Sequence, residues 1–200
     1  MPPAPRRPLS WGLITVLSAV VVGVVFGVVD LLASLGAFTP GPRYHAITRH
    51  PCGLVTAEQL GPYLPAAYAK DEDYDATIRG HTMATCRWDS TRDPSRRITL
   101  RVELLRGAGR QSAAAAAHAL YSQDHRYSYQ VRPLAGVGDE ALVGRDTTSA
   151  WYKVVAESRT ANRIVTVEYE ATPALPVGTA ETMAVGLLRT VAHGLRDSDF

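Results

Sequence analysis

The sequence has few cysteines and little net charge, and these two features exclude several classes of protein. Its 200 residues include two cysteines, and 21 basic residues against 19 acidic residues give a net charge of +2. Because the basic and acidic residues nearly balance, the chain produces no field that would attract nucleic acid, and we expect no nucleic-acid partner. Two cysteines are too few for a cysteine knot, and the absence of a glycine period or a sustained heptad excludes collagen-like and coiled-coil proteins. The composition, 46% hydrophobic and 20% charged, is typical of a globular protein,.

The common catalytic motifs are also missing. None of the six histidines lies in H-E-x-x-H, and no serine lies in G-x-S-x-G,. One match to the dinucleotide-binding pattern G-x-G-x-x-A occurs at Gly136, Gly138 and Ala141. That pattern requires a helix after the glycines, whereas residues 142–155 have the pattern of a turn and a strand, so we interpret the glycines as turn residues. We therefore predict no catalytic residue, no cofactor and no metal site, and a protein that is not an enzyme.

One long apolar run lies near the beginning of the sequence. Residues 11–29 contain no charged side chain, and as a helix they would span about 28 Å, close to the thickness of a bilayer core. Arg6 and Arg7 precede the run, which favours a cytoplasmic amino terminus. We expect a cytoplasmic tail over 1–10, a transmembrane signal-anchor helix over 11–38, an extracytoplasmic linker over 39–50 and an extracytoplasmic domain over 51–200. The expected localisation is the cell membrane, with a single membrane-spanning helix.

A cleavable signal peptide is the alternative interpretation of this run, with Ser34 and Gly36 as the small residues before the cleavage site,. The run is longer than the apolar region of most signal peptides, which favours the anchor. Both interpretations export residues 40–200.

Cys52 and Cys86 are expected to form a disulfide, because both follow the apolar run and the outer side of the membrane is oxidising,. Their spacing fits neither the paired ligands of a zinc site nor the Cys-x-x-Cys of a redox pair. A structural disulfide is therefore the role that we assign to them.

The periodicity of the remaining chain predicts an α+β domain. Thr56 and Gln59 form a capping-box pattern at the start of a short helix, and apolar residues alternate over 81–88 and 98–104,. An alanine-rich helix over 112–121 is followed by a strand near 127–131 and by a turn and a strand within 142–155. Further strands are expected over 151–156 and 164–169, and a helical stripe over 180–195. The order α-β-β-α-β-β-β-β-α predicts one compact domain with a mainly antiparallel sheet packed by helices.

The acidic segment between Lys70 and Asp75 is interpreted as a solvated loop. Its alternating carboxylates are reminiscent of a calcium-binding EF-hand, but counting from Asp71 the required Gly and Glu positions hold Ala76 and Thr82,. The segment therefore does not fit that motif.

Four motifs resemble an actinobacterial family of exported proteins, the domain-of-unknown-function family numbered 3558. They are Pro51-Cys52-Gly53-Leu54, Cys86-Arg87-Trp88, Gly136-Val137-Gly138-Asp139-Glu140-Ala141 and the final alanine-rich helix. The resemblance covers about residues 50–195 and implies a compact α/β domain with an antiparallel sheet in the cell envelope, without an assigned chemistry. Members are typically lipoproteins, but this chain has no lipid-accepting cysteine after its apolar run, so a helix would provide the anchor.

These observations favour a membrane-anchored extracytoplasmic module that is noncatalytic. The expected partners are the membrane, another envelope protein or a small apolar ligand. The alternative is an envelope hydrolase whose residues converge only in the folded chain, and the groups to inspect are Asp139, Glu140, Asp146, His125 and Glu168,. A structural or assembly role beside another membrane protein is the third possibility. A deep cleft with converging carboxylates or a His–carboxylate pair would favour the hydrolase.

Overall fold

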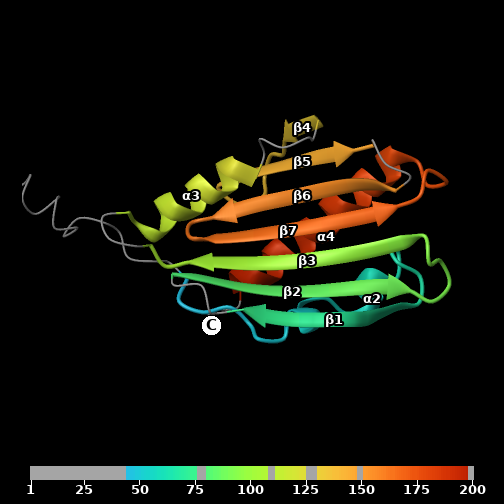
Figure 1. Ribbon diagram of the computed structural model, residues 1–200, viewed down its shortest axis with the longest axis horizontal. Helices are drawn as coiled ribbons and strands as arrows, with labels where there is room; N and C mark the ends of the chain where they lie inside the picture. Colours follow the sequence, from blue (N-terminus) through green and yellow to red (C-terminus); the bar gives the residue numbers. More distant parts are fainter. Residues whose placement is uncertain (1–43, 76–79, 108–110, 125–129, 148–150, 198–200) are drawn as a thin grey trace, which may run out of the picture. The chain divides into compact units, whose positions relative to one another are not determined.

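The computed structural model describes residues 44–75, 80–107, 111–124, 130–147 and 151–197 (Figure 1). The expected cytoplasmic tail over 1–10 and the expected membrane-spanning helix over 11–38 lie outside these residues. Within the described part of the chain, no helix combines the length and the apolar character needed to cross a bilayer. The membrane anchor therefore stays a prediction.

The domain contains a seven-stranded, fully antiparallel sheet. Its strands are β1 (Ala67–Asp75), β2 (His81–Ser90), β3 (Arg96–Leu105), β4 (Gln130–Pro133), β5 (Glu140–Asp146), β6 (Tyr152–Thr160) and β7 (Arg163–Ala171). Their order across the sheet is β1-β2-β3-β7-β6-β5-β4 (Figure 1). The sheet confirms the predicted α+β class, and the two predicted hairpins are present as β2–β3 and β6–β7. The last strand in sequence lies at the centre, between β3 and β6.

In the described part of the chain, two short helices and two longer helices accompany the sheet. The short ones are η1 (Pro51–Leu54) and α2 (Ala57–Leu60), and the longer ones are α3 (Ala113–Asp124) and α4 (Val177–Asp197). The capping box before α2 is formed as predicted. The Gln59 amide donates to Thr56 Oγ1, and the Thr56 amide donates to Gln59 Oε1 over 2.8 Å. Both bonds satisfy amides that a helix start leaves without a partner in the helix.

The main core lies between one face of the sheet and α4. Alternate residues of β3 point into it, because successive side chains of a strand face opposite sides. The fully or almost fully buried side chains of this core include Ile98, Leu100, Val102, Leu104, Val154, Val167, Tyr169, Leu187, Leu188 and Val191. Each large apolar side chain buried in this way contributes roughly 1.5–3 kcal/mol relative to exposure. The helical stripe predicted over 180–195 is the buried side of α4.

A disulfide between Cys52 and Cys86 ties η1 to the same face of the sheet. Cys86 is completely buried in β2, and the two Cα atoms are 5.1 Å apart. The bridge holds the segment before α2 against the core. It therefore extends the covered part of this sheet face toward β1.

The opposite face of the sheet is covered by α3 at one end. Ala117 and Tyr121 of this helix pack on Leu105, Leu142 and Ile164. The small alanine side chains allow the helix to lie close to the strands, as the alanine-rich sequence predicts. The rest of this face carries mainly charged side chains, and we call it the open face.

The acidic segment 70–75 is a strand, β1, and the prediction of a solvated loop was wrong. It pairs with β2 along its length, with Asp71 opposite Arg87 and Asp73 opposite Thr85. Most of its side chains are exposed, because β1 is an edge strand. Charged side chains are poor strand formers on average but are common on edges, where they oppose pairing with other molecules. The observed order of elements therefore has one strand more than predicted.

Part of the segment expected to be a linker packs on the domain. Ile47 is buried, and the Arg163 guanidinium lies 3.8 Å from the centre of the Tyr44 ring. Tyr44 is also hydrogen-bonded to Asn162 in the turn between β6 and β7. That turn consists of two residues, Ala161 and Asn162.

Candidate functional site

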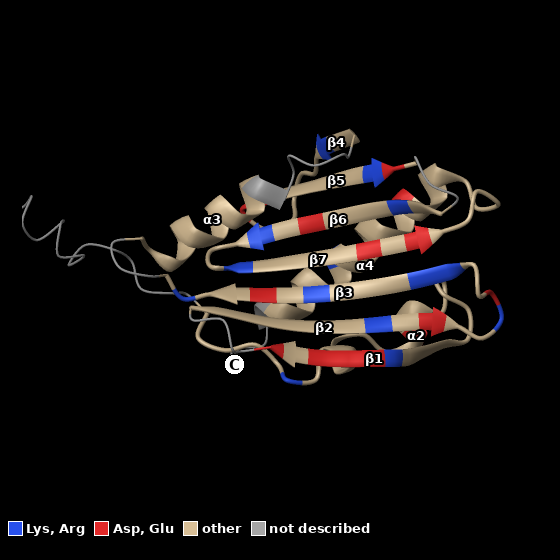
Figure 2. Cartoon of the chain, viewed as in Figure 1, with Lys and Arg blue, Asp and Glu red and all other residues tan. Residues whose placement is uncertain are grey.

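Strand register brings charges of alternating sign into one row on the open face. Asp89 of β2 lies opposite Arg97 of β3, and Arg97 lies opposite Glu170 of β7. Glu170 lies opposite Lys153 of β6, and Lys153 lies opposite Asp146 of β5. In Figure 2, blue and red segments lie beside one another on neighbouring strands. We call these five residues, together with Lys70 of β1, the charged row.

The charged row is held together by direct contacts. Arg97 Nε donates to Asp89 Oδ1 over 3.0 Å, and Arg97 Nη1 donates to Glu170 Oε2 over 3.3 Å. Lys153 Nζ lies 3.3 Å from Glu170 Oε1 and 2.8 Å from Glu168 Oε2. Lys70 Nζ lies 3.0 Å from Asp89 Oδ2, on the side of β1. Arg97 and Lys153 therefore each contact two carboxylates.

These contacts shift the pKa values of the groups in the directions expected for ion pairs. Burial alone would raise the pKa of Asp89, but hydrogen bonds from Lys70 and Arg97 hold it below its usual range. The hydrogen bond to Asp89 is the main reason that the pKa of Arg97 is raised. Burial alone would lower the pKa of Lys153, but its carboxylate partners raise it. All three groups are thus charged at neutral pH.

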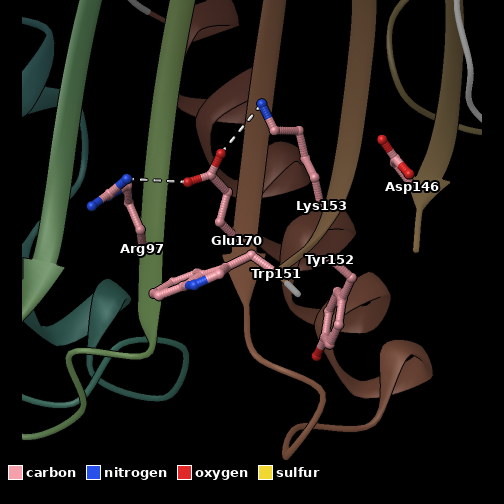
Figure 3. Close-up of a pocket in the computed structure, with 6 residues that line it drawn as sticks. All are labelled: Arg97, Asp146, Trp151, Tyr152, Lys153 and Glu170. Atoms are coloured by element: carbon pink, nitrogen blue, oxygen red, sulfur yellow. Dashed lines mark hydrogen bonds and ion pairs between the residues drawn. The ribbon is translucent and has the colours of Figure 1, made fainter. Parts of the chain in front are cut away.

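A pocket of about 370 Å³ opens beside the row (Figure 3). Its lining residues are Arg97, Asp146, Trp151, Tyr152, Lys153 and Glu170. Trp151 directly precedes β6, and 39% of its surface is exposed. Its indole lies beside Arg97 and Glu170 in the view of Figure 3. A volume of this size is within the range of about 300–1,000 Å³ seen for small-ligand sites.

Tyr152 fixes the strand that carries Lys153. Because side chains alternate along β6, the Tyr152 side chain points away from Lys153 (Figure 3),. Its hydroxyl donates to the carbonyl of Leu175, in the segment before α4. The start of β6 is therefore anchored on both sides of the sheet, which positions Trp151 and Lys153.

The pocket lining combines aromatic rings with charged groups that already contact one another. Among the residues that the structure describes, this lining contains no serine, histidine or cysteine, and Glu170 contacts both Arg97 and Lys153. Among the residues that the structure describes, no group of histidine, cysteine and carboxylate side chains is arranged to hold a metal ion. The pocket presents the exposed ring of Trp151 beside oriented hydrogen-bond donors and acceptors.

The groups considered for a hydrolase do not converge. Asp146 lines the pocket and Glu168 contacts it only through Lys153. Asp139 and Glu140 lie at the other end of the sheet, where both contact Arg159. His125 lies outside the described residues. The four described groups, Asp139, Glu140, Asp146 and Glu168, therefore form no common site.

The described residues contain three His–carboxylate pairs, His50–Glu72, His81–Glu103 and His118–Glu140, and the pair at Glu140 lies on the surface. His118 Nδ1 is 3.0 Å from Glu140 Oε2, and 58% of the histidine side chain is exposed. The pKa of Glu140 is lowered mainly by its hydrogen bond from Arg159, with His118 adding to the effect. This pair stabilises the contact between α3 and β5, and it is not enclosed in a cleft.

The glycines of the dinucleotide-like pattern form a turn, as predicted. Gly136 and Gly138 have φ angles of 78° and 64°, in the left-handed region that favours glycine,. A strand, β5, follows them instead of the helix that a dinucleotide site needs,. A Cβ at position 138 would lie 2.5 Å from the Arg159 carbonyl oxygen, so this glycine permits a close backbone approach.

A second hollow, of about 400 Å³, lies on the α4 side of the domain. It is lined by Tyr63, Arg132, Leu134, Glu181, Thr182, Val185, Gly186 and Arg189. Its only ion pair among described residues joins Arg132 to Glu181. The large apolar side chains that the described structure exposes are Tyr68, Val131 and Trp151, and none of them lines this hollow. The pocket beside Trp151 is therefore the stronger candidate.

Sequence reasoning missed Arg97, Trp151, Lys153 and Glu170. The alternation along β3 and β7 does predict that Arg97 and Glu170 face away from the core. Arg97 and Glu170 are 73 positions apart in the sequence. Their proximity depends on the pairing of β3 with β7, which no local pattern specifies.

Neither a family model nor a curated protein matches the chain, so the resemblance to the family numbered 3558 stays a hypothesis. Among solved structures, the extracellular domain of PknH from Mycobacterium tuberculosis is similar, with a TM-score of 0.55. The fold resembles a known extracellular domain. The match covers 79% of this chain and 100% of the PknH domain at 9% sequence identity. At that identity, the similarity to the PknH domain shows a shared fold alone.

Proposed function

We propose that this chain is a noncatalytic, ligand-binding module on the outer side of a cell membrane, and that its ligand binds on the open face beside Trp151. The observation that carries the proposal is the pocket of about 370 Å³ with an exposed indole and a row of mutually paired charges. Aromatic rings supply contact area at low entropic cost, and the fixed polar groups orient a ligand.

Three observations support an extracytoplasmic location. The Cys52–Cys86 disulfide is typical of proteins in oxidising compartments,. The solved structure with a similar fold is itself an extracellular domain. The apolar run over 11–29 has the length and composition of a membrane anchor,. Together they support export of residues 40–200 by an anchor or by a cleaved signal peptide.

The location can be tested with reporters fused to the carboxyl end of the full chain. We expect alkaline phosphatase to be active there and green fluorescent protein to be dark when exported in an unfolded form. Both cysteines should resist alkylation until a reductant is added. A fluorescent cytosolic fusion with two reactive thiols would contradict the proposed location. Mass spectrometry of the mature amino terminus separates an anchor from a cleaved signal peptide.

Ligand binding can be tested on the purified full chain in detergent. The chain is screened by thermal shift against sugars, amino acids, short peptides and inorganic anions. Hits are then titrated by calorimetry with the unmodified chain and with Trp151→Ala. We expect one class of compound to raise the melting temperature and to lose affinity in the variant. The proposal is contradicted if every hit binds the variant as tightly, or if no class binds.

A further inference from the structure

The charged row offers no net charge to a ligand. Lys70, Arg97 and Lys153 balance Asp89, Glu170 and Asp146. An added anion would be repelled by the carboxylates that already lie 2.8–3.3 Å from Arg97 and Lys153,. An added cation would meet a Glu170 carboxylate that lies between two cations. The row therefore disfavours simple ions of either sign.

The same groups retain hydrogen-bonding capacity for a neutral ligand. Two of the five N–H donors of Arg97 are used in its bonds to Asp89 and Glu170,. Lys153 uses two of its three donors on Glu168 and Glu170,. Each oxygen of Glu170 accepts from one cation and keeps a second lone pair. Donors and acceptors thus alternate across the row at the strand spacing of about 4.8 Å.

Two exposed aromatic side chains lie along this row. Trp151 directly precedes β6, and its indole lies beside Arg97 and Glu170 (Figure 3), whereas Tyr68 of β1 lies opposite Asp89. Tyr68 is 44% exposed. Strands β1 and β6 are separated by four strand spacings, or about 19 Å,. The two aromatic residues are therefore carried by β1 and by the start of β6, with polar groups of the row between and beside them.

We infer that the row between Trp151 and Tyr68 binds an extended, uncharged oligosaccharide. The inference rests on the proposed function, because it names the ligand class of the same site. A pyranose ring has an apolar face of C–H groups that packs on an indole, and its hydroxyls each donate and accept. Arg97, Glu170 and Lys153 contact the hydroxyls, Trp151 stacks on a ring at one end, and Tyr68 stacks on a ring farther along.

The test uses sugars of two lengths with the full chain in detergent. The probes are the dimers and hexamers of the maltose, cellobiose, xylobiose and chitobiose series, preceded by a broad neutral glycan array. We expect a hexamer to bind more tightly than its dimer. Trp151→Ala should weaken both lengths by about tenfold or more, whereas Trp151→Phe should keep part of the affinity. Tyr68→Ala should weaken the hexamer by severalfold and leave the dimer unchanged.

Two controls separate a specific site from a general loss of structure. Val131→Ala removes an exposed apolar side chain of similar exposure outside the row, and it should leave affinity for both lengths unchanged. All variants should keep the circular dichroism spectrum and the melting temperature of the unmodified chain. Binding of a neutral sugar should also change less than about twofold between low and high salt, because screening acts only on charged ligands.

The outcomes distinguish this inference from the function on which it rests. If amino acids, peptides or anions bind at Trp151 and no neutral glycan does, the oligosaccharide inference is wrong and the binding function stands. If a glycan binds but Tyr68→Ala does not separate hexamer from dimer, the extended site is wrong. Binding of acidic glycans alone, with a strong dependence on salt, also overturns the inference. If no class binds, both proposals fail.

Discussion

The backbone amide of Tyr44 donates to Asn162 Oδ1 over 3.0 Å, and Asn162 Nδ2 donates back to the carbonyl oxygen of Tyr44 over 2.9 Å. The two residues are 118 positions apart in the sequence. Asn162 Nδ2 also donates to the carbonyl oxygen of Leu105 over 2.8 Å, so one buried amide side chain joins three segments. The carboxamide thereby fixes where the chain enters the domain.

The first prediction concerns this residue. Asn162→Ala should lower the free energy of unfolding by about 2–4 kcal/mol, since it leaves the amide of Tyr44 and two carbonyls without their partner. Denaturation by urea of the full chain in detergent measures the change. Thr182→Ala, which removes an exposed side-chain bond to a helix carbonyl, is the control and should cost little. An Asn162→Ala effect as small as that of the control would refute the role of this amide.

The second prediction concerns the disulfide. Replacing Cys52 and Cys86 together by serine should lower the free energy of unfolding by roughly 3–4 kcal/mol, because a bridge over 34 residues restricts the unfolded chain,. Reduction of the unmodified chain should give a similar loss. The melting temperature, measured with and without reductant, checks both. If the melting temperature is the same with and without reductant, the bridge does not stabilise the fold.

The third prediction compares two glycines of the same turn. Gly138→Ala should destabilise the domain by more than about 2 kcal/mol, because φ is 64° and a Cβ would lie 2.5 Å from the Arg159 carbonyl oxygen,. Gly136→Ala has a similar φ of 78° but open space around the new Cβ. It should therefore cost only about 1 kcal/mol, the strain of the backbone alone. Equal losses in thermal unfolding would show that the close approach is unimportant.

The fourth prediction is a dependence on pH. The pKa of Asp89 in the folded chain lies below its ordinary value of 3.8. A lowered pKa means that the unfolded chain binds the proton more tightly, so the stabilising contribution is complete above about pH 5 and is lost as pH falls below 4. Asp89→Asn should therefore flatten the loss of stability between pH 5 and pH 3. Unfolding curves at several pH values measure this, and identical slopes would contradict it.

The sequence predicted the local elements that depend on short-range patterns. The alternation over 98–104 became β3, and the capping box at Thr56 formed as expected. The sequence-based prediction was wrong at β1, which was expected to be a loop, because charged residues on an edge strand have the composition of a loop. Edge strands need no apolar face when their partner strand carries complementary charges, as Arg87 does for Asp71.

The candidate site was less predictable than the fold. Trp151 was recognised as part of a strand, but its position beside Arg97 depends on the pairing of β3 with β7 and of β7 with β6. Such pairings are non-local, and a shift of one residue would move every side chain to the other face. A site assembled from single residues of several strands therefore leaves no motif in the sequence.

The central position of β7 has a consequence for how the chain acquires its structure. The hairpin β2–β3 and the strands β4–β6 have no common partner until β7 has been synthesised and has left the ribosome. Until then β3 and β6 each present an unpaired edge, which is prone to aggregation. The sheet thus cannot be completed before β7 is available, and a truncation before residue 163 would leave two incomplete groups of strands rather than a smaller domain.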